Sequence, residues 1–228
     1  DCARYGLNQL VSFRWTELKR IMNVSLWTMI QNAISISTWF LFFIFIEHLG
    51  ERSLAITNIV RNVSSIPFMT ITAFASTCSS LVSNLIGSGE ARYVMPTIRQ
   101  HVQLCTCIVW PVILLIACLP TYVLHIYTDM PDLVEAAVPT LWVLCSSYLF
   151  QCAGFIFFQS VSGTGDTRSA FLLEIVALTC YLIFIVTVIL LLKMDVAVCW
   201  FAEHVYAVAI GLLSYLYLKK GSWQRKQI

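Results

Sequence analysis

Three ionisable side chains, Glu174, Glu203 and His204, lie inside long apolar stretches of the sequence. A charge in the middle of a membrane-spanning helix costs free energy, so such residues are rare and are functional-site candidates by default. A carboxylate can couple transport to a proton gradient if it binds a proton on one side of a membrane and releases it on the other. We therefore predict that these three residues couple the movement of a cargo to protons or to another cation.

Neutral polar residues fall at a similar depth in other apolar stretches. At about 1.5 Å per residue, Glu174 lies roughly 8 Å from one end of its span, and Gln31, Asn32 and Gln151 fall in the same half or near the midplane. Tyr181 follows Glu174 by two turns on the same helical face. We expect these residues to line one polar substrate cavity. Interhelical hydrogen bonds, worth about 0.6 kcal/mol on average, explain Gln31, Asn32 and Gln151 equally well.

Glu203 falls in the opposite half of the membrane, roughly 10 Å from the other end of its span, so we expect no dyad with Glu174. Arg61, at the rim of the predicted cavity, can extend its side chain towards Glu203 from the interface. The pair then has a second interpretation as a structural ion pair. On that interpretation, Glu203→Gln mainly lowers the yield of folded protein.

The elements that carry these residues are membrane-spanning helices. Hydrophobic residues make up 59% of the chain and charged residues 11%, and the mean hydropathy is +0.80, whereas charged residues alone make up about a quarter of soluble proteins. A spanning helix needs about 20 apolar residues. We predict an all-α integral membrane protein in which residues 22–218 form a six-helix lobe in the lipid bilayer, with spans at 24–46, 53–86, 102–119, 138–161, 169–192 and 196–218.

The positive charges predict the topology. If successive loops lie on alternate sides of the membrane, Arg52 and Lys193 are the only basic loop residues on one side. Lys and Arg residues mark the cytoplasmic side, so the other side is the cytoplasmic one. Both ends of the segment are therefore expected on the cytoplasmic side of a plasma (inner) membrane. This distribution also excludes a basic patch that binds nucleic acid. The residues on the basic side are Arg4, Arg14, Lys19, Arg20, Arg92, Arg99, Arg168, Lys219, Lys220, Arg225 and Lys226.

The two flanks of the lobe differ from it in composition. Residues 1–21 mix apolar and basic side chains, as in a helix that lies on the cytoplasmic interface, and residues 219–228 form a basic tail. Because the chain starts at Asp1 without an initiating Met, we expect the interfacial helix to link the first span to an upstream segment.

Other chemistries lack the residue patterns they need. No Cys-x-x-Cys pair or Cys/His cluster has the spacing of a zinc site, so we expect no metal and no cofactor beyond a coupling ion, H⁺ or Na⁺. His204 is the only histidine well inside a span, and no motif marks a nearby Ser or Cys as an activated nucleophile. We expect a protein that is not an enzyme.

Two turns on the basic side share a pattern, GSGEAR at 87–92 and GTGDTR at 163–168. A glycine can end the first helix in the left-handed conformation, and the acid can accept hydrogen bonds from the first N–H groups of the next helix. Neither copy follows a strand or contains the Lys-Ser/Thr pair of a P-loop. We predict tight helix-to-helix turns at both places.

The stretch from 39 to 92 contains EHLG at 47–50, AITNIV at 55–60 and LVSNLIG at 81–87. With GTGDTR at 163–168, it resembles the multidrug and toxic compound extrusion (MATE) family. The resemblance implies one lobe of a twelve-helix transporter with two pseudo-symmetric lobes, here the C-terminal lobe, with the N-terminal six-helix lobe missing. It also implies export of small amphiphilic or cationic substrates by antiport with sodium or protons, through alternating access of a cavity between the lobes.

The match to the family's site is partial. Some branches carry a Glu on the helix that matches 24–46 and an Asp on the helix that matches 138–161, which correspond to Ser35 and Gln151 here. Because neither is acidic, we expect proton coupling rather than sodium coupling, either through Glu174 or in the missing lobe, with Ser35 lining the cavity.

Two alternative functions remain. One is a lipid-linked oligosaccharide flippase of the same superfamily, but an anionic pyrophosphate cargo favours several basic residues in the cavity, and Arg61 is the one candidate. The other is a lobe that does not transport by itself.

Overall fold

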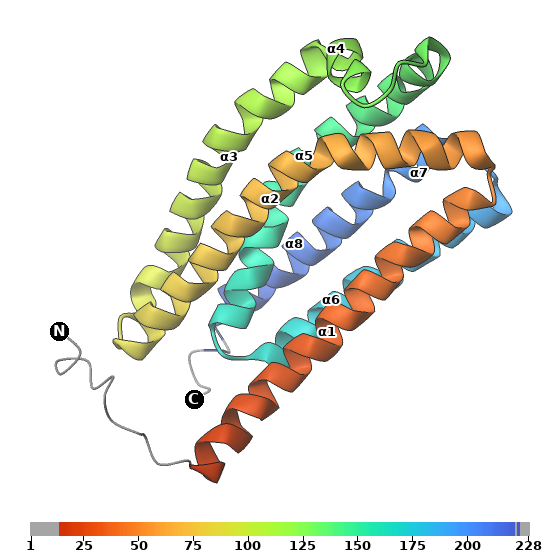
Figure 1. The fold of residues 1–228 in the computed structure, drawn as a ribbon. Helices are drawn as coiled ribbons and strands as arrows, with labels where there is room; N and C mark the ends of the chain where they lie inside the picture. Colours follow the sequence, from red (N-terminus) through yellow and green to blue (C-terminus); the bar gives the residue numbers. More distant parts are fainter. Residues whose placement is uncertain (1–13, 222, 224–228) are drawn as a thin grey trace.

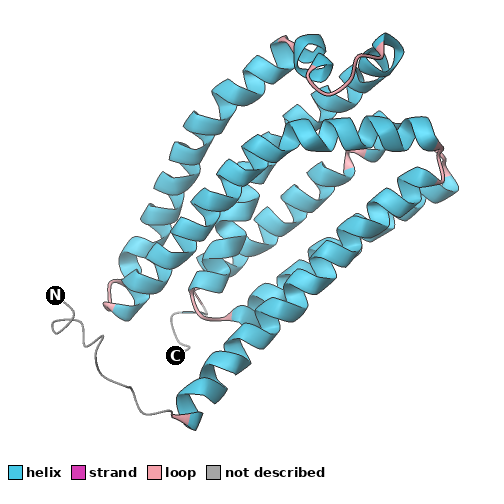
Figure 2. Cartoon of the chain, viewed as in Figure 1, coloured by secondary structure: helices cyan, strands magenta, loops and turns pink. Residues whose placement is uncertain are grey.

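The computed structural model describes residues 14–221 and 223, and in this part of the chain every regular element is a helix (Figure 2). The long helices are α1 (Trp15–Glu47), α2 (Glu51–Gly87), α3 (Val94–Cys118), α5 (Pro131–Gly163), α6 (Thr167–Ile185) and α8 (Ala202–Lys220). The short elements are η1 (Ala91–Tyr93), α4 (Pro120–His125), the π-helical segment η2 (Val186–Leu191) that continues α6, and α7 (Val196–Cys199).

Six segments of the described chain are long and apolar enough to cross a membrane, and each overlaps one predicted span. They are Ser25–Glu47, Glu51–Gly87, Ala91–Cys118, Pro131–Gly163, Thr167–Leu191 and Val196–Lys220. The protein is thus an all-α, multi-pass membrane protein.

The sixth span, predicted at 196–218, consists of two helical segments, α7 and α8. Between α7 and α8, the N–H groups of Phe201 and Glu203 donate to the carbonyl groups three residues earlier, at Val198 and Trp200. This tighter winding starts a new helix at Ala202. Glu203 therefore lies in the first turn of α8, where the helix dipole favours a negative charge.

Lys and Arg residues are distributed unequally between the two ends of the bundle. The beginnings of α1, α3 and α6 and the ends of α2, α5 and α8 lie at one end, as Figure 1 shows. This end holds Arg92, Arg99, Arg168, Lys219 and Lys220, whereas Arg52 and Lys193 lie at the opposite end, as the loop pattern predicted.

The predicted flanking segments lie mostly outside the described residues. Residues 15–21 form the start of α1, which continues to Glu47 without interruption. Residues 1–13 of the predicted interfacial helix (1–21), with Arg4, and the tail residues Arg225 and Lys226 lie outside the described part.

Helix α5 is the central element, packed against α2, α3 and α8 (Figure 1). Glycines bring α5 and α8 together: a Cβ at Gly154 would lie 2.8 Å from the carbonyl oxygen of Ala207, and one at Gly211 would lie 3.0 Å from the Cα of Gly154. Small residues at such crossings allow the backbones of membrane helices to approach closely. This contact sets the rotation of α8 and hence the direction of its polar side chains.

The two related turns differ in their caps. Gly89 and Gly165 both adopt positive φ angles, 78° and 82°, as predicted. Asp166 caps α6 by accepting hydrogen bonds from the backbone N–H of Ser169 at 3.2 Å and from its Oγ at 2.7 Å. Glu90 precedes only the short η1 and makes no such cap, so the prediction of an acidic cap is confirmed in one turn and wrong in the other.

Candidate functional site

Glu174 lies in the interior of the bundle, with 4% of its surface exposed. Its Oε1 accepts a hydrogen bond from the Oγ of Ser35 on α1 and another, at 3.3 Å, from the hydroxyl of Tyr206 on α8. The side chain of Gln31 is a further hydrogen-bonding neighbour. Its Oε2 is buried without a hydrogen-bond partner among the described residues. The partners that the carboxyl group has within residues 14–221 are thus all neutral.

Packing of three helices brings this group together. Helix α6 lies between α1 and α8 and contacts both. The ring of Trp27 on α1 lies 5.4 Å from that of Phe171 and 5.9 Å from the guanidinium of Arg168, which holds the two helices in register. Gln31 and Ser35, one turn apart, then face α6 on the same side of α1.

Glu203 belongs to a second polar group, between α5 and α8. Gln151 donates its amide N–H groups to Oε2 of Glu203 at 3.3 Å and to Oγ of Ser147 at 3.0 Å. Gln151 lies one turn before Gly154, and Glu203 lies one turn before Ala207. The close contact between Gly154 and Ala207 therefore brings the side chains of Gln151 and Glu203 together. The single predicted cavity is therefore divided: Gln31 and Ser35 lie with Glu174, but Gln151 lies with Glu203.

Two other predicted cavity residues make no hydrogen bond to Glu174 in the described structure. Asn32 is exposed on α1, because consecutive residues of a helix point in different directions. Tyr181 is 4% exposed, and its ring lies 6.2 Å from that of Tyr206 and 6.4 Å from that of Phe42. Its hydroxyl is buried and has no hydrogen-bond partner in the described part of the chain.

The expected ion pair between Arg61 and Glu203 is absent from the described structure. The guanidinium of Arg61 lies instead over the rings of Trp39, at 5.6 Å, and Phe43, at 5.3 Å. These aromatic residues lie one turn apart on α1, and their π faces attract a cation. The structural interpretation of Glu203 as a partner of Arg61 was therefore wrong, and Glu203 remains a candidate for function.

No hydrogen bond joins His204 to Glu174 or Glu203 in the described part of the chain. Its Nε2 lies 2.9 Å from Oγ of Ser146, and its ring lies 5.0 Å from Phe201 and 5.9 Å from Phe150. This setting gives no support to its predicted role beside Glu174 and Glu203.

Tyr206 is the residue that the sequence interpretation missed. It lies three residues after Glu203 in an apolar stretch, so the two side chains share one face of a helix. This spacing marks Tyr206 as a neighbour of Glu203. No pattern in the sequence predicts its contact with Glu174, which lies on another helix.

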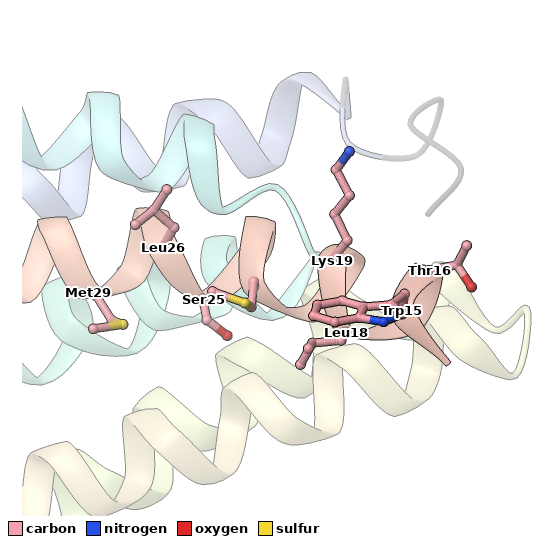
Figure 3. A pocket seen from close by; sticks show the side chains of 8 residues that line it. Trp15, Thr16, Leu18, Lys19, Ser25, Leu26 and Met29 are labelled. Atoms are coloured by element: carbon pink, nitrogen blue, oxygen red, sulfur yellow. The ribbon is translucent and has the colours of Figure 1, made fainter. Parts of the chain in front are cut away.

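A groove opens on the first four turns of α1, away from both polar groups. Figure 3 shows its lining residues, which all come from α1. They are mainly apolar, and none of the candidate residues is among them: Trp15, Thr16, Leu18, Lys19, Met22, Ser25, Leu26 and Met29.

Comparisons with known proteins agree with this fold. The family model described as MatE matches residues 28–190. A probable multidrug resistance protein, NorM, from Thermotoga maritima is 21% identical over 220 residues, which cover 96% of this chain and 47% of that protein. The chain thus spans about half the length of this curated relative.

Two solved structures share the fold. One is an outward-facing multidrug resistance MATE family transporter of the MOP superfamily, with a TM-score of 0.80 and 17% identity. The other is a MOP superfamily transporter from Pyrococcus furiosus, described by a reversed polarity of its binding pocket that suggests a different function, with a TM-score of 0.79 and 17% identity. Each match covers 90% of this chain and 46% of the other.

Proposed function

The chain belongs to the MatE family, and on this premise we propose that it contributes one six-helix half of a secondary active transporter that exports organic cations and related amphiphilic compounds. Export is driven by antiport of a cation, a proton rather than sodium, with alternating access of a cavity between this half and an N-terminal six-helix half. The transporter lies in the plasma (inner) membrane, and the basic end of the bundle faces the cytoplasm.

The surroundings of Glu174 carry this proposal. A buried carboxylate needs an opposite charge or it binds a proton, since an unpaired charge in an apolar interior is costly. Glu174 has Ser35, Tyr206 and Gln31 as neighbours, all neutral, and its Oε2 has no partner among the described residues. Such a carboxyl group can bind a proton in one state of the transport cycle and release it in another.

Glu174 departs from the acidic positions that the MATE resemblance implies, but it lies beside one of them. That resemblance places an acidic residue near Ser35 in some branches of the family. Here Ser35 is neutral, and the carboxyl group that reaches its hydroxyl comes from Glu174 on α6. An acidic group thus occupies the same region but is supplied by a different helix.

The same surroundings bear on whether the coupling ion is a proton or sodium. The hydroxyl groups of Ser35 and Tyr206 donate to the carboxyl group, which suits a group that exchanges a proton. Oxygen atoms of the same residues are also ligands that hard cations accept. Transport that is independent of sodium and dependent on pH would support the proton, and strict dependence on sodium would contradict it.

An efflux experiment tests the function. Ethidium efflux is measured from pump-deficient cells that express this chain alone or joined to its native upstream sequence, with and without a protonophore. We expect efflux only from the joined form, and we expect the protonophore to abolish it. Efflux from neither form would contradict the proposal and would shift support to the flippase or to a half that does not transport.

A further inference from the structure

Tyr206 lies between the two buried carboxyl groups. Its hydroxyl donates to Oε1 of Glu174 at 3.3 Å. Glu203 lies one turn earlier on the same face of α8 and is a neighbour of Tyr206. One side chain thus contacts one buried carboxyl group and lies next to the other on the same helical face.

Tyr181 adds a second hydroxyl to this region. Its ring packs edge-on against Tyr206, with centroids 6.2 Å apart, and Glu203 is a further neighbour. The hydroxyl is buried and lacks a hydrogen-bond partner among the described residues. Buried hydroxyl groups nearly always bond to protein or to ordered water, and an isolated one beside other polar groups is a typical place for a bound water molecule.

The other polar groups that the described helices place around this region are uncharged side chains. Gln31 and Ser35 face it from α1, Gln151 and Tyr148 from α5. Arg61 is held over the rings of Trp39 and Phe43. No lysine or arginine of the described residues therefore pairs with Glu174 or Glu203, and a proton can move between the two carboxyl groups without competition from a fixed positive charge.

We propose that Tyr206 and a water molecule bound at the Tyr181 hydroxyl form a proton path that joins Glu203 to Glu174. This inference rests on the proposed function and adds the route that the proton takes. In the transfer, the carboxyl of Glu203 gives its proton to the water, and the water gives a proton to the phenolic oxygen of Tyr206. Tyr206 gives its own hydroxyl proton to Oε1 of Glu174. One proton moves in total, Glu203 becomes the carboxylate, Glu174 becomes the acid, and both the water and Tyr206 end neutral.

Two phenylalanine substitutions in the full-length protein test this path. Tyr206→Phe and Tyr181→Phe each remove one hydroxyl and keep the ring. Tyr215→Phe is the matched control, since Tyr215 lies on the same helix and packs its ring 5.4 Å from Phe157, away from both carboxyl groups. Tyr181→Phe removes a hydroxyl that has no hydrogen-bond partner among the described residues, so its loss should leave the folded yield unchanged or raise it.

Two assays in reconstituted vesicles separate a proton path from a structural role. The first measures ethidium transport driven by a pH gradient. The second measures exchange of labelled for unlabelled substrate at equal pH, which needs no net proton movement. We expect Tyr206→Phe and Tyr181→Phe to slow the first by roughly tenfold or more and to leave the second unchanged, with Tyr215→Phe normal in both.

Three results would overturn the path. Normal pH-driven transport by both Tyr206→Phe and Tyr181→Phe would show that the proton does not use these hydroxyls. An equal loss in both assays would show a structural role. If the unaltered protein shows no pH-driven transport, the proposed function fails and the path fails with it, whereas the first two results leave the proposed function intact.

Discussion

The Oγ of Ser35 on α1 donates a hydrogen bond to Oε1 of Glu174 on α6, across 139 residues of sequence. In some branches of the family that the sequence resembles, an acidic residue is expected at the position of Ser35. Here Ser35 instead contacts an acidic residue on another helix. Because α1 and α6 pack directly against each other, Glu174 can supply its carboxyl group at this position. The coupling chemistry that we propose depends on this contact.

Replacement of Glu174 by glutamine tests whether its carboxyl group exchanges the coupling proton. Glutamine keeps the shape and can still accept from Ser35, but it cannot bind and release a proton. We expect transport driven by a pH gradient to fall by roughly 100-fold or more with little change in folded yield. The control is Glu135→Gln, since Glu135 is exposed on α5. Uptake at the normal rate in Glu174→Gln vesicles would remove Glu174 from the mechanism.

Glu203 and Arg61 should behave as independent residues. Since Arg61 lies over Trp39 and Phe43 rather than beside Glu203, the effects of Arg61→Gln and Glu203→Gln on the free energy of unfolding should add to within about 0.5 kcal/mol. Denaturant unfolding in detergent of both single variants and the double variant measures this. A larger interaction energy would restore the ion pair. Glu203→Gln by itself should fold in normal yield, because the new amide oxygen can still accept from Gln151.

The close approach of α5 and α8 predicts a strong effect of one added methyl group. In Gly154→Ala the new Cβ would lie 2.8 Å from the carbonyl oxygen of Ala207, so the helices must move apart. We expect a loss of about 1–3 kcal/mol in the free energy of unfolding, together with slower transport, since the same crossing positions Gln151 against Glu203. Thermal unfolding in detergent measures the first effect. Gly87→Ala is the matched control, because a Cβ there meets nothing within 4 Å, and an equal loss in both variants would contradict the prediction.

The cap of α6 predicts a difference between the two related turns. Asp166 accepts hydrogen bonds from Ser169 and from the hydroxyl of Tyr217, whereas Glu90 caps no helix. Asp166→Ala should lower the free energy of unfolding by about 1 kcal/mol, and Glu90→Ala should leave it nearly unchanged. Thermal unfolding of the two variants under identical conditions checks this, and the prediction fails if the two midpoints shift equally.

Several features could be predicted from the sequence because they depend on local chemistry. Apolar length decides which segments cross a membrane, so the six spans follow from composition. The cost of a buried charge singles out Glu174 and Glu203. The glycines at 89 and 165 follow from the left-handed conformation that a tight turn needs, and both adopt it.

The partners of these residues were decided only by the tertiary structure. Ser35 and Tyr206 meet Glu174, Gln151 meets Glu203, and Arg61 meets two aromatic rings, because each helix has one particular rotation about its axis. In a soluble protein the boundary between apolar and polar faces sets that rotation. In a membrane the lipid is as apolar as the protein interior, so apolarity alone marks no inner face. Close contacts between helices, such as Gly154 against Ala207, select the rotation, and these contacts exist only once the helices have packed.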